Sequence, residues 1–591
     1  MIGRVLRLAL AGLLLVPAAL AGDSTQVLSR AKVEARLSSS WPDMLNKGWA
    51  PLRIELRNDS DRARVVSLTG SVNDWQLSST WAQRVELGAG ERAELELTLP
   101  AGGAWQSEWN FVVRCDGDSA YFSGILAAGG DSAYCNVLVT GPDEVAASEV
   151  TRWQEETSTR TVGYSAPGST SAHDNVRLGF ALHGALPRSN TAYTSLDLVV
   201  LDARKGLPTD AKLEPLMAWA RSGGRLMILG EDALQLASRN GALAPWLEER
   251  FTLASEPRRV LCGLGQIVFM DTEAGFEDEY VRKLVAQHAE EDSGDAAPRT
   301  NDDSRTSDAK LDVPGLGAIP YRIFALLLLG FALLIGPANF VWVRARKRPV
   351  LLLITIPLIA LVSSLGLLGY GVLVQGLDIK VASATVSLLD SRLHRSASIE
   401  KRIVFAGLSP DGLRPDPGTS VHPVPSNVSA MGPQRLQLSI ERSPELLLGG
   451  DFIPARTSVM QVLLNERAAR GRLEIARAPE GLKVTNSLGT RLERVVARDA
   501  AGAWYVLSQP LEQGQSAVLD AADESNLGLM LEQPFRVVRA GSTLTPALPP
   551  ACFVARTSSA PFRDDCGLEL NEIQGTHALF GVWGLDEEAW R

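Results

Sequence analysis

Histidine and cysteine are scarce in this chain, with six His and five Cys among 591 residues. Metal sites draw several such ligands together at characteristic spacings, and His173-Asp174 has no second ligand at a recognised spacing. Gly263-Leu264-Gly265 lacks the third glycine of a dinucleotide-binding loop, and no G-x-S-x-G motif surrounds Ser222. We therefore expect no metal, no cofactor and no catalytic residue of a recognised type.

Positive charge is also in short supply, because 58 Lys and Arg face 68 Asp and Glu, a formal net charge of −10. Outside one short connector, at 344–348, nothing in the sequence resembles a basic binding face. Nucleic-acid binding depends on such a face. The charge balance therefore argues against a nucleic-acid partner.

The N-terminus has the pattern of a signal peptide. Arg4 and Arg7 precede an apolar stretch at 8–16, and Ala19-Leu20-Ala21 has the form of a cleavage site. We expect residues 1–21 to be removed, and an uncleaved anchor is the alternative. No Cys follows the cleavage site, which argues against a lipid-anchored N-terminus.

Two apolar runs, 323–343 and 350–374, contain no Asp, Glu, Lys, Arg or His. A bilayer core requires roughly 20 apolar helical residues, so each run is long enough to span it. We predict a two-helix transmembrane hairpin at 319–376. The short connector is basic, and a basic loop belongs on the cytoplasmic side. The topology-setting residues are Arg344, Arg346, Lys347 and Arg348.

Small residues in the two runs predict where the helices pack. Ala332 and Gly336 form one small-xxx-small pair, and Ala360 and Ser364 form another. With the connector in the cytosol, everything before and after the hairpin lies in the periplasm. We therefore expect an inner-membrane protein of bacterial type, with membrane lipid as one partner.

Alternating apolar and polar residues predict β-structure on both sides of the hairpin. Residues 52–57 and 93–99 alternate at period two and are bounded by turn residues. We predict an immunoglobulin-like β-sandwich at 22–142. Residues 382–388 and 435–440 alternate in the same way. We predict that 377–591 is a C-terminal β-sandwich region of one or two domains.

Between residues 143 and 289 the pattern changes to a parallel α/β domain. The apolar run 196–201, an amphipathic stretch at 210–222 and the run 225–229 read as strand, helix and strand. Residues 290–318 are polar and acidic, and we expect a flexible linker. The predicted fold class is thus multidomain, α/β plus all-β.

The sequence 196–232, LDLVVLDARKGLPTDAKLEPLMAWARSGGRLMILGED, resembles the core of class I glutamine-amidotransferase-like domains found in bacterial envelope proteins. In active members a Cys on the turn after a strand is assisted by a His. Here that turn is Gly230-Glu231-Asp232, and His173 and His183 have no nucleophile to serve. The resemblance implies the fold without the chemistry. We expect Glu231 and Asp232 to cap the next helix, with paired acids as the alternative.

The hairpin, with its segment 335–340 leading into the basic connector, resembles a motif of uncharacterised bacterial envelope proteins. In those proteins an Ig-like region, an amidotransferase-like domain, a membrane segment and further β-structure follow in order. Some are encoded beside MoxR-type AAA+ ATPases. The resemblance implies other envelope proteins, including such an ATPase system, as partners.

Four of the five cysteines fall into local pairs, Cys115 with Cys135 and Cys552 with Cys566. In an oxidising compartment such pairs are candidate disulfides, and their connectivity is inferred from proximity alone. Cys262 is left over in a strand-like stretch. It reads as a buried small hydrophobe, with a reactive thiol as the alternative.

Together these features favour a non-catalytic inner-membrane protein whose periplasmic domains bind or scaffold partners in a cell-envelope assembly. Two alternatives stay open. The first is an envelope hydrolase or amidotransferase-like enzyme, which needs a pocket at the carboxyl ends of the parallel strands. The second is an auxiliary subunit of an exporter.

Overall fold

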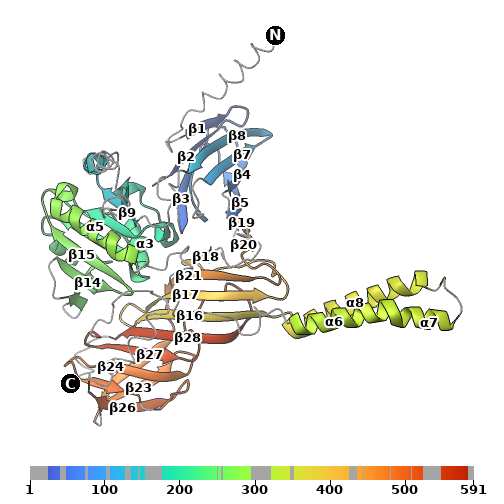
Figure 1. The fold of residues 1–591 in the computed structure, drawn as a ribbon. Coiled ribbons are helices and arrows are strands. Elements are labelled where there is room, and N and C mark those ends of the chain that lie inside the picture. Colours follow the sequence, from blue (N-terminus) through green and yellow to red (C-terminus); the bar gives the residue numbers. More distant parts are fainter. Residues whose placement is uncertain are drawn as a thin grey trace, which may run out of the picture.

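The computed structural model describes most of the chain after residue 23. The described residues are 24–39, 41, 48–73, 77–100, 107–126, 135–143, 147–153, 176–248, 251–253, 257–294, 321–346, 350, 352–424, 436–442, 445–479, 481–507, 509–523 and 548–583. The expected signal peptide (1–21) lies outside them, and so do residues 295–318 of the expected linker. The expectation that the linker begins at residue 290 is wrong, because residues 290–294 belong to the helix α5, Glu279–Gly294. The expected multidomain, β-rich architecture is confirmed: four sheets and a few helices make up the described chain (Figure 1).

The N-terminal part is a sandwich of two sheets. One has the order β1-β2-β3-β6 and the other β20-β19-β5-β4-β7-β8. The strands are β1 Ser24–Leu28, β2 Val33–Ser39, β3 Trp49–Asn58, β4 Arg64–Asn73, β5 Leu77–Leu87, β6 Arg92–Pro100, β7 Ser107–Cys115, β8 Asp118–Leu126, β19 Leu436–Arg442 and β20 Leu446–Gly450. Alternate residues such as Ile54 and Leu68 are buried and meet in one hydrophobic cluster, as a period-two pattern requires.

Strands β19 and β20 belong to this sandwich although they follow the predicted hairpin in the sequence. β19 runs parallel to β5, from the pair Leu436–Leu77 to the pair Arg442–Gln83. The expectation that 22–142 and 377–591 form separate sandwiches is therefore wrong for this segment. The alternation around Leu438 identifies a half-buried strand, but it carries no information on which sheet edge the strand joins.

The α/β part is built on a seven-stranded sheet of order β10-β9-β11-β12-β15-β14-β13. The first five strands are parallel neighbours, and β14 and β13 are antiparallel. The strands are β9 Cys135–Gly141, β10 Val176–Leu182, β11 Leu198–Asp202, β12 Arg225–Gly230, β13 Thr252–Leu253, β14 Arg258–Cys262 and β15 Gly265–Asp271. The expected domain boundary at 142 is wrong, because β9 belongs to this sheet. All its residues are buried, so it lacks the alternation of a sandwich strand.

Helices cover both faces of this sheet. α3 packs with Val199 and Ile228 in one cluster, whereas α5 packs with Val200 and Met227 in another. Gly223, at φ 114°, ends α3 in a conformation that glycine adopts without strain. The helices are α3 Asp210–Arg221, α4 Ala233–Ser238 and α5 Glu279–Gly294, with 3₁₀ turns η2 His183–Ala185, η3 Asn190–Ser195, η4 Ala244–Trp246 and η6 Gly275–Glu277.

The C-terminal part is one eleven-stranded sheet that curls on itself, of order β18-β21-β17-β16-β28-β27-β24-β25-β26-β23-β22. Strands β22 and β23, at one end of the sheet, share a hydrophobic cluster with β16, β27 and β28 in its middle, and Phe553 and Trp583 belong to it. The strands are β16 Ile379–Asp390, β17 Arg395–Ala406, β18 Thr419–Val424, β21 Ser458–Ala468, β22 Arg472–Ala478, β23 Gly481–Ser487, β24 Leu492–Arg498, β25 Trp504–Val506, β26 Ser516–Ala522, β27 Cys552–Thr557 and β28 Leu570–Val582.

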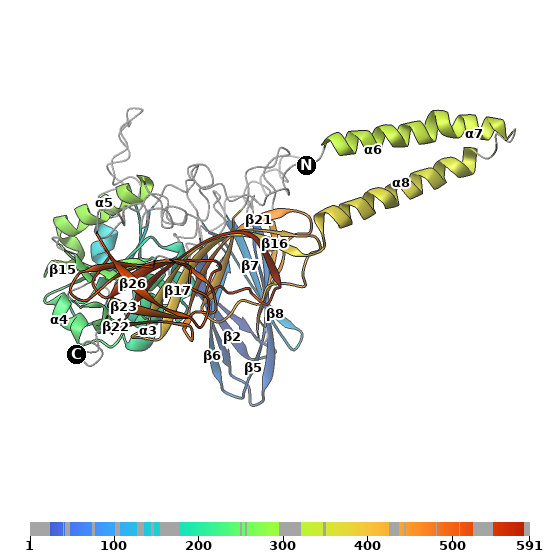
Figure 2. The same ribbon diagram turned by 90° about the horizontal axis from the view of Figure 1, so that it is seen from below.

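A helical hairpin projects from the body where β16 begins, and both views show its two arms side by side (Figures 1 and 2). One arm is α6 Tyr321–Leu333, the π-helical turn η7 Leu334–Ala338 and α7 Asn339–Ala345; the other is α8 Leu352–Gln375. The π turn contains Pro337, which removes a backbone donor. By length and composition, Leu328–Ala345 is apolar enough to cross a membrane, and Leu352–Gly366 is a shorter apolar helix.

Replacing Leu438 with Ala should loosen the N-terminal sandwich, although residue 438 follows the hairpin. Leu438 is buried in the shared core, and a large-to-small change there costs about 2–5 kcal/mol. Hydrogen exchange should show faster exchange of β5 amides. The exposed neighbour Gln437→Ala serves as the control and should leave β5 unchanged. Unaltered β5 exchange in Leu438→Ala would contradict the shared sheet.

Candidate functional site

Open parallel sheets bind ligands outside the carboxyl ends of their strands, where neighbouring connections leave in opposite directions. Here the chain passes from β9 to β10 on one side, and β11, β12 and β15 follow on the other. The crevice between the ends of β9 and β11 is therefore the place to look for a site. Asp202 ends β11, and Gly141 ends β9.

Side chains of the protein itself fill this crevice. Arg204 Nη2 lies 2.7 Å from Asp202 Oδ2 and 2.9 Å from Glu149 Oε1. The backbone N–H of Phe276 donates to Glu149 Oε2 at 3.1 Å. Gly275 lies directly under the guanidinium, because a Cβ there would come within 2.2 Å of Arg204 Cζ.

The opposite charges of this network stabilise one another. Hydrogen bonds to Asp202 raise the pKa of Arg204, although burial lowers it, and Glu149 adds to the increase. Both carboxylates are only 7% exposed. These residues were not predicted from the sequence. Asp202, an acid at the end of a buried parallel strand, could have indicated a polar site at this edge of the sheet. Among the described residues, Arg204, Asp202 and Glu149 thus form an ion cluster in which each charge has a partner.

His183 lies at the same edge, directly after β10. Burial lowers its pKa, although a hydrogen bond with the backbone of Thr140 opposes the decrease. The ring is therefore neutral near pH 7. A neutral imidazole can act as a base, but it needs a nucleophile within reach.

Cys262 lies at the opposite edge of the sheet. It pairs with Gly265 at the start of β15, whereas His183 follows the end of a strand parallel to β15. The thiol is fully buried, and burial raises its pKa to about 12, with the nearby Arg221 acting in the other direction. Cys262 and His183 therefore cannot act as a pair. His173 lies outside the described residues.

The turn after β12 has the backbone of a strained elbow. Asp232 has φ 53° and ψ 37°, the left-handed region that side-chain-bearing residues rarely adopt. Its side chain makes no capping hydrogen bond; instead Asp271 Oδ1 accepts from the N–H of Ala233 at 3.3 Å. The expectation that the Asp232 side chain caps α4 is wrong, because the cap is supplied by a neighbouring strand.

A second polar cluster lies in the C-terminal sheet. Ser383 Oγ donates to Glu572 Oε1, and His577 Nε2 lies 3.2 Å from the same oxygen. Burial raises the pKa of Glu572, but hydrogen bonds from His577, Arg563 and Ser383 outweigh it and lower the pKa to about 2. A nucleophilic triad needs His between Ser and the acid. Here the acid is in the middle, so Ser383 is not activated.

The expected disulfides are not formed. All five cysteines carry buried thiols, within the part of the chain that is described. Cys115 ends a sandwich strand and Cys135 begins β9, so the two belong to different hydrophobic clusters. Cys552 begins β27, whereas Cys566 lies beyond it, 3.8 Å from Arg402 Nη2. Proximity in sequence did not translate into proximity of side chains.

In the hairpin, the expected packing residues differ in burial, and Ala360 is half-buried. Ala332, Gly336 and Ser364 are exposed, and a Cβ at Gly336 would meet nothing within 4 Å. The buried side chains of the described hairpin are Asn339 and Val343. The helices therefore meet nearer the connector than the small-residue pairs suggested.

The basic connector is described only in part. Arg344 is in the last turn of α7, and the Arg346 guanidinium lies 4.7 Å from the centre of the Trp342 ring. Lys347 and Arg348 lie outside the described residues.

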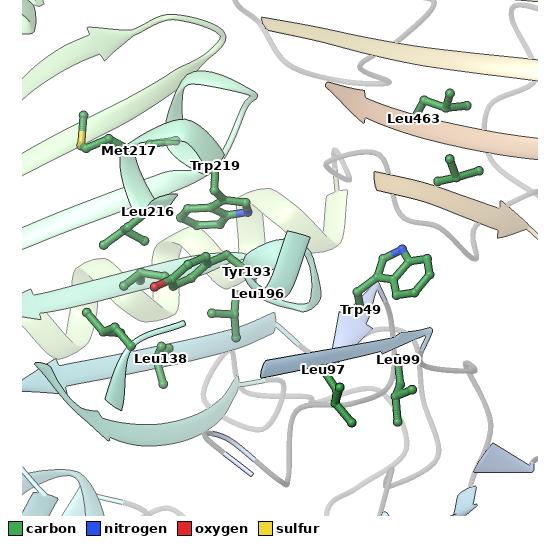
Figure 3. Packing of buried hydrophobic residues seen from close by; sticks show 14 of the residues in the cluster. Trp49, Leu97, Leu99, Leu138, Tyr193, Leu196, Leu216, Met217, Trp219 and Leu463 are labelled. Atoms are coloured by element: carbon green, nitrogen blue, oxygen red, sulfur yellow. The ribbon is translucent and has the colours of Figure 1, made fainter. Parts of the chain in front are cut away.

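The N-terminal sandwich, the α/β part and the C-terminal sheet meet at a buried aromatic junction (Figure 3). Trp41 of the sandwich donates its indole N–H to Ser195 Oγ of the α/β part at 3.2 Å. The backbone N–H of Trp49 donates to Thr194 Oγ1 at 3.1 Å, and the Trp49 ring meets the ring of His422 of β18 edge-on, with ring centres 5.9 Å apart. Tyr193 and Trp219 pack at the same junction, with ring centres 6.2 Å apart.

Ion pairs join the α/β part to the C-terminal sheet, and the pair between Arg221 and Glu466 is buried on both sides. At the end of α3, Arg221 Nη2 lies 2.6 Å from Glu466 Oε1 on β21, and both side chains are 4% exposed. Arg392, which follows β16, contacts Glu248 Oε1 at 2.5 Å and Asp390 Oδ2 at 2.7 Å. Removing one partner of a buried pair is strongly destabilising. These contacts therefore fix one arrangement of the two parts.

Comparisons with known proteins add no function. No protein family matches the chain, and no curated protein matches it. Among solved structures, red sea bream transglutaminase is 10% identical over 16% of each chain, with a TM-score of 0.14. A β-glucuronidase from Bacteroides uniformis is 12% identical over 34% of each chain, with a TM-score of 0.16. The chain thus spans about a third of these proteins or less, and likeness at this level carries no argument.

The described residues thus contain a filled crevice, a neutral histidine and thiols that are buried away from it. Among them, no group of three or more His, Cys, Asp or Glu side chains could hold a metal ion. Polar and aromatic contacts of the described residues join the N-terminal sandwich, the α/β part and the C-terminal sheet.

His422, at the aromatic junction, should make the protein less stable in mild acid. Burial lowers the pKa of His422 to about 3, whereas histidine in the unfolded chain has a pKa near 6.5. The buried neutral ring therefore makes its full contribution to the stability of the fold above pH 6.5, and this contribution is lost as the pH falls towards 3. The loss is about 1.4 kcal/mol per pH unit in that range. Urea unfolding at pH 7.5 and 5.5 should show a smaller difference for His422→Gln than for the unmodified protein. The exposed His394→Gln serves as the control and should retain the full difference.

Proposed function

We propose that this chain is a bacterial inner-membrane protein whose periplasmic domains form a rigid, non-catalytic scaffold for other envelope proteins. One observation carries the proposal. β19, which follows the helical hairpin, pairs along its whole length with β5, which precedes it. Both flanks must therefore lie on the same side of any membrane that the hairpin enters, and this requires an even number of crossings.

The dimensions of the hairpin support insertion into a bilayer. α8 has 24 residues, about 36 Å of helix at 1.5 Å per residue, against a hydrocarbon core of about 30 Å. Large apolar side chains point outward along it, among them Leu353 at 80% and Val362 at 61% exposure. In water such a surface is costly, whereas lipid would cover it.

The filled crevice supports a scaffold rather than an enzyme. The α/β part, which we propose to be a class I glutamine-amidotransferase-like domain, has Arg204 and Glu149 where a ligand would lie, and Cys262 at the far edge. The ion pairs and the aromatic junction hold three soluble parts in one geometry, which suits a binding platform. By resemblance, a MoxR-type ATPase system is the partner we propose.

The topology is tested with a fluorescent reporter that matures only in the cytosol. Fused after Arg591, it should stay dark, because the C-terminus is proposed to be periplasmic. Inserted between Arg346 and Lys347, in the connector, it should fluoresce. Bright fluorescence from the fusion at Arg591 would rule out the proposed arrangement.

The scaffold role is tested by crosslinking in intact cells, followed by mass spectrometry of captured proteins. The double variant Cys262→Ala, His183→Gln removes the candidate catalytic groups and should capture the same envelope proteins in unchanged amounts. Arg221→Ala breaks the buried pair with Glu466 and should lower the capture, because the two parts lose their fixed geometry. Loss of capture in the double variant, with the fold intact by circular dichroism, would instead favour an enzyme.

A further inference from the structure

Two large apolar side chains are exposed at the foot of the soluble body, where the hairpin joins it. Leu377 is 50% exposed and Leu408 is 58% exposed. Leu377 comes two residues after Gln375, the last residue of α8, and Leu408 follows the end of β17. Figure 2 shows the hairpin leaving the body at this end of the sheet.

The two leucines are neighbours in space. The N–H of Gly407 donates to the carbonyl of Asp378 at 3.3 Å. A Cβ at Gly407 would lie 2.8 Å from Leu377 Cα, so the two turns are in close contact. Both exposed leucines thus lie on adjoining turns beside the end of α8, and we call Leu377 and Leu408 the foot.

An exposed cation borders the foot. Arg456 precedes β21, and its N–H donates to the carbonyl of Ala406 at 2.7 Å, which holds it at the same end of the sheet. Its side chain is exposed. Apolar side chains beside a long cationic one match the boundary between lipid acyl chains and phosphate headgroups.

We propose that the foot is a second membrane contact, in which Leu377 and Leu408 enter the outer boundary of the bilayer and Arg456 meets lipid phosphate. The proposal rests on the proposed insertion of the hairpin. Lipid is the proposed partner of the foot because the foot lies directly beside the end of α8. α8 is longer than the hydrocarbon core by about 6 Å, so the end of α8 and Leu377 lie at headgroup depth. A lone hairpin could tilt or rotate, whereas this contact fixes the height of the soluble body above the bilayer.

The chain offers a matched control on the same sheet. Ile573 is also apolar and 42% exposed. It is the extra residue of a β-bulge, inserted between the pairs Val381–Glu572 and Ala382–Gln574, which turns its side chain outward. At about 3.3 Å per strand residue, it lies on the order of 10 Å farther from the end of α8 than Leu377 does. It should therefore remain in water.

The test places a polarity-sensitive fluorophore on single cysteines of the full chain in phosphatidylethanolamine–phosphatidylglycerol bilayers. The native cysteines are all buried, so labelling will report the introduced site. The variants are Leu361→Cys in the hairpin, Leu377→Cys, Leu408→Cys and Ile573→Cys. Quenching is measured with nitroxide lipids labelled at the headgroup or in mid-chain.

Dyes at 377 and 408 should emit at shorter wavelength and be quenched by headgroup nitroxide. The dye at 361 should be quenched by mid-chain nitroxide, and the dye at 573 should be quenched by neither nitroxide. If the dyes at 377 and 408 behave like the one at 573 while 361 is quenched, the foot is not a lipid contact and the hairpin proposal stands. A blue shift without quenching at 377 and 408 indicates protein contact and also overturns the foot. If 361 is not quenched, the hairpin proposal itself fails.

Discussion

The parallel ladder between β5 and β19 is the constraint on which the rest of the architecture depends. Parallel strands cannot be joined by a tight turn and need a crossover. Here the crossover contains the whole α/β part, the hairpin and the first strands of the C-terminal sheet. The hairpin therefore leaves and returns to one body, and the parts of that body are held through contacts distant in sequence.

Buried polar contacts decide how the parts fit together. Burying Arg221 of the α/β part with Glu466 of the C-terminal sheet gives little net stability over apolar packing, but leaving either charge alone would be costly. The crevice follows the same logic, because Glu149 and Asp202 neutralise Arg204 in the position where related sheets hold ligands.

Local patterns in the sequence predicted local structure well. The helix expected at 210–222 is Asp210–Arg221, and the strand expected at 225–229 is Arg225–Gly230, because periodicity and the Gly223 stop act within one element. Partners distant in sequence were not predictable. The residues around Cys135 and Leu438 do not indicate which sheet their strands join. Neither the Arg204 cluster nor the burial of Asn339 in the hairpin can be predicted from the spacing of residues alone.

The shared sheet also orders the steps by which the protein is made. A ribosome delivers β5 long before β19, and in the proposed topology β5 reaches the periplasm while the hairpin is still being synthesised. Until residues 436–442 arrive, one edge of β5 presents unpaired N–H and C=O groups, the kind of edge that recruits other chains. The exported half would therefore be a natural client for periplasmic chaperones, and truncation before β19 would leave an adhesive fragment rather than a smaller working protein.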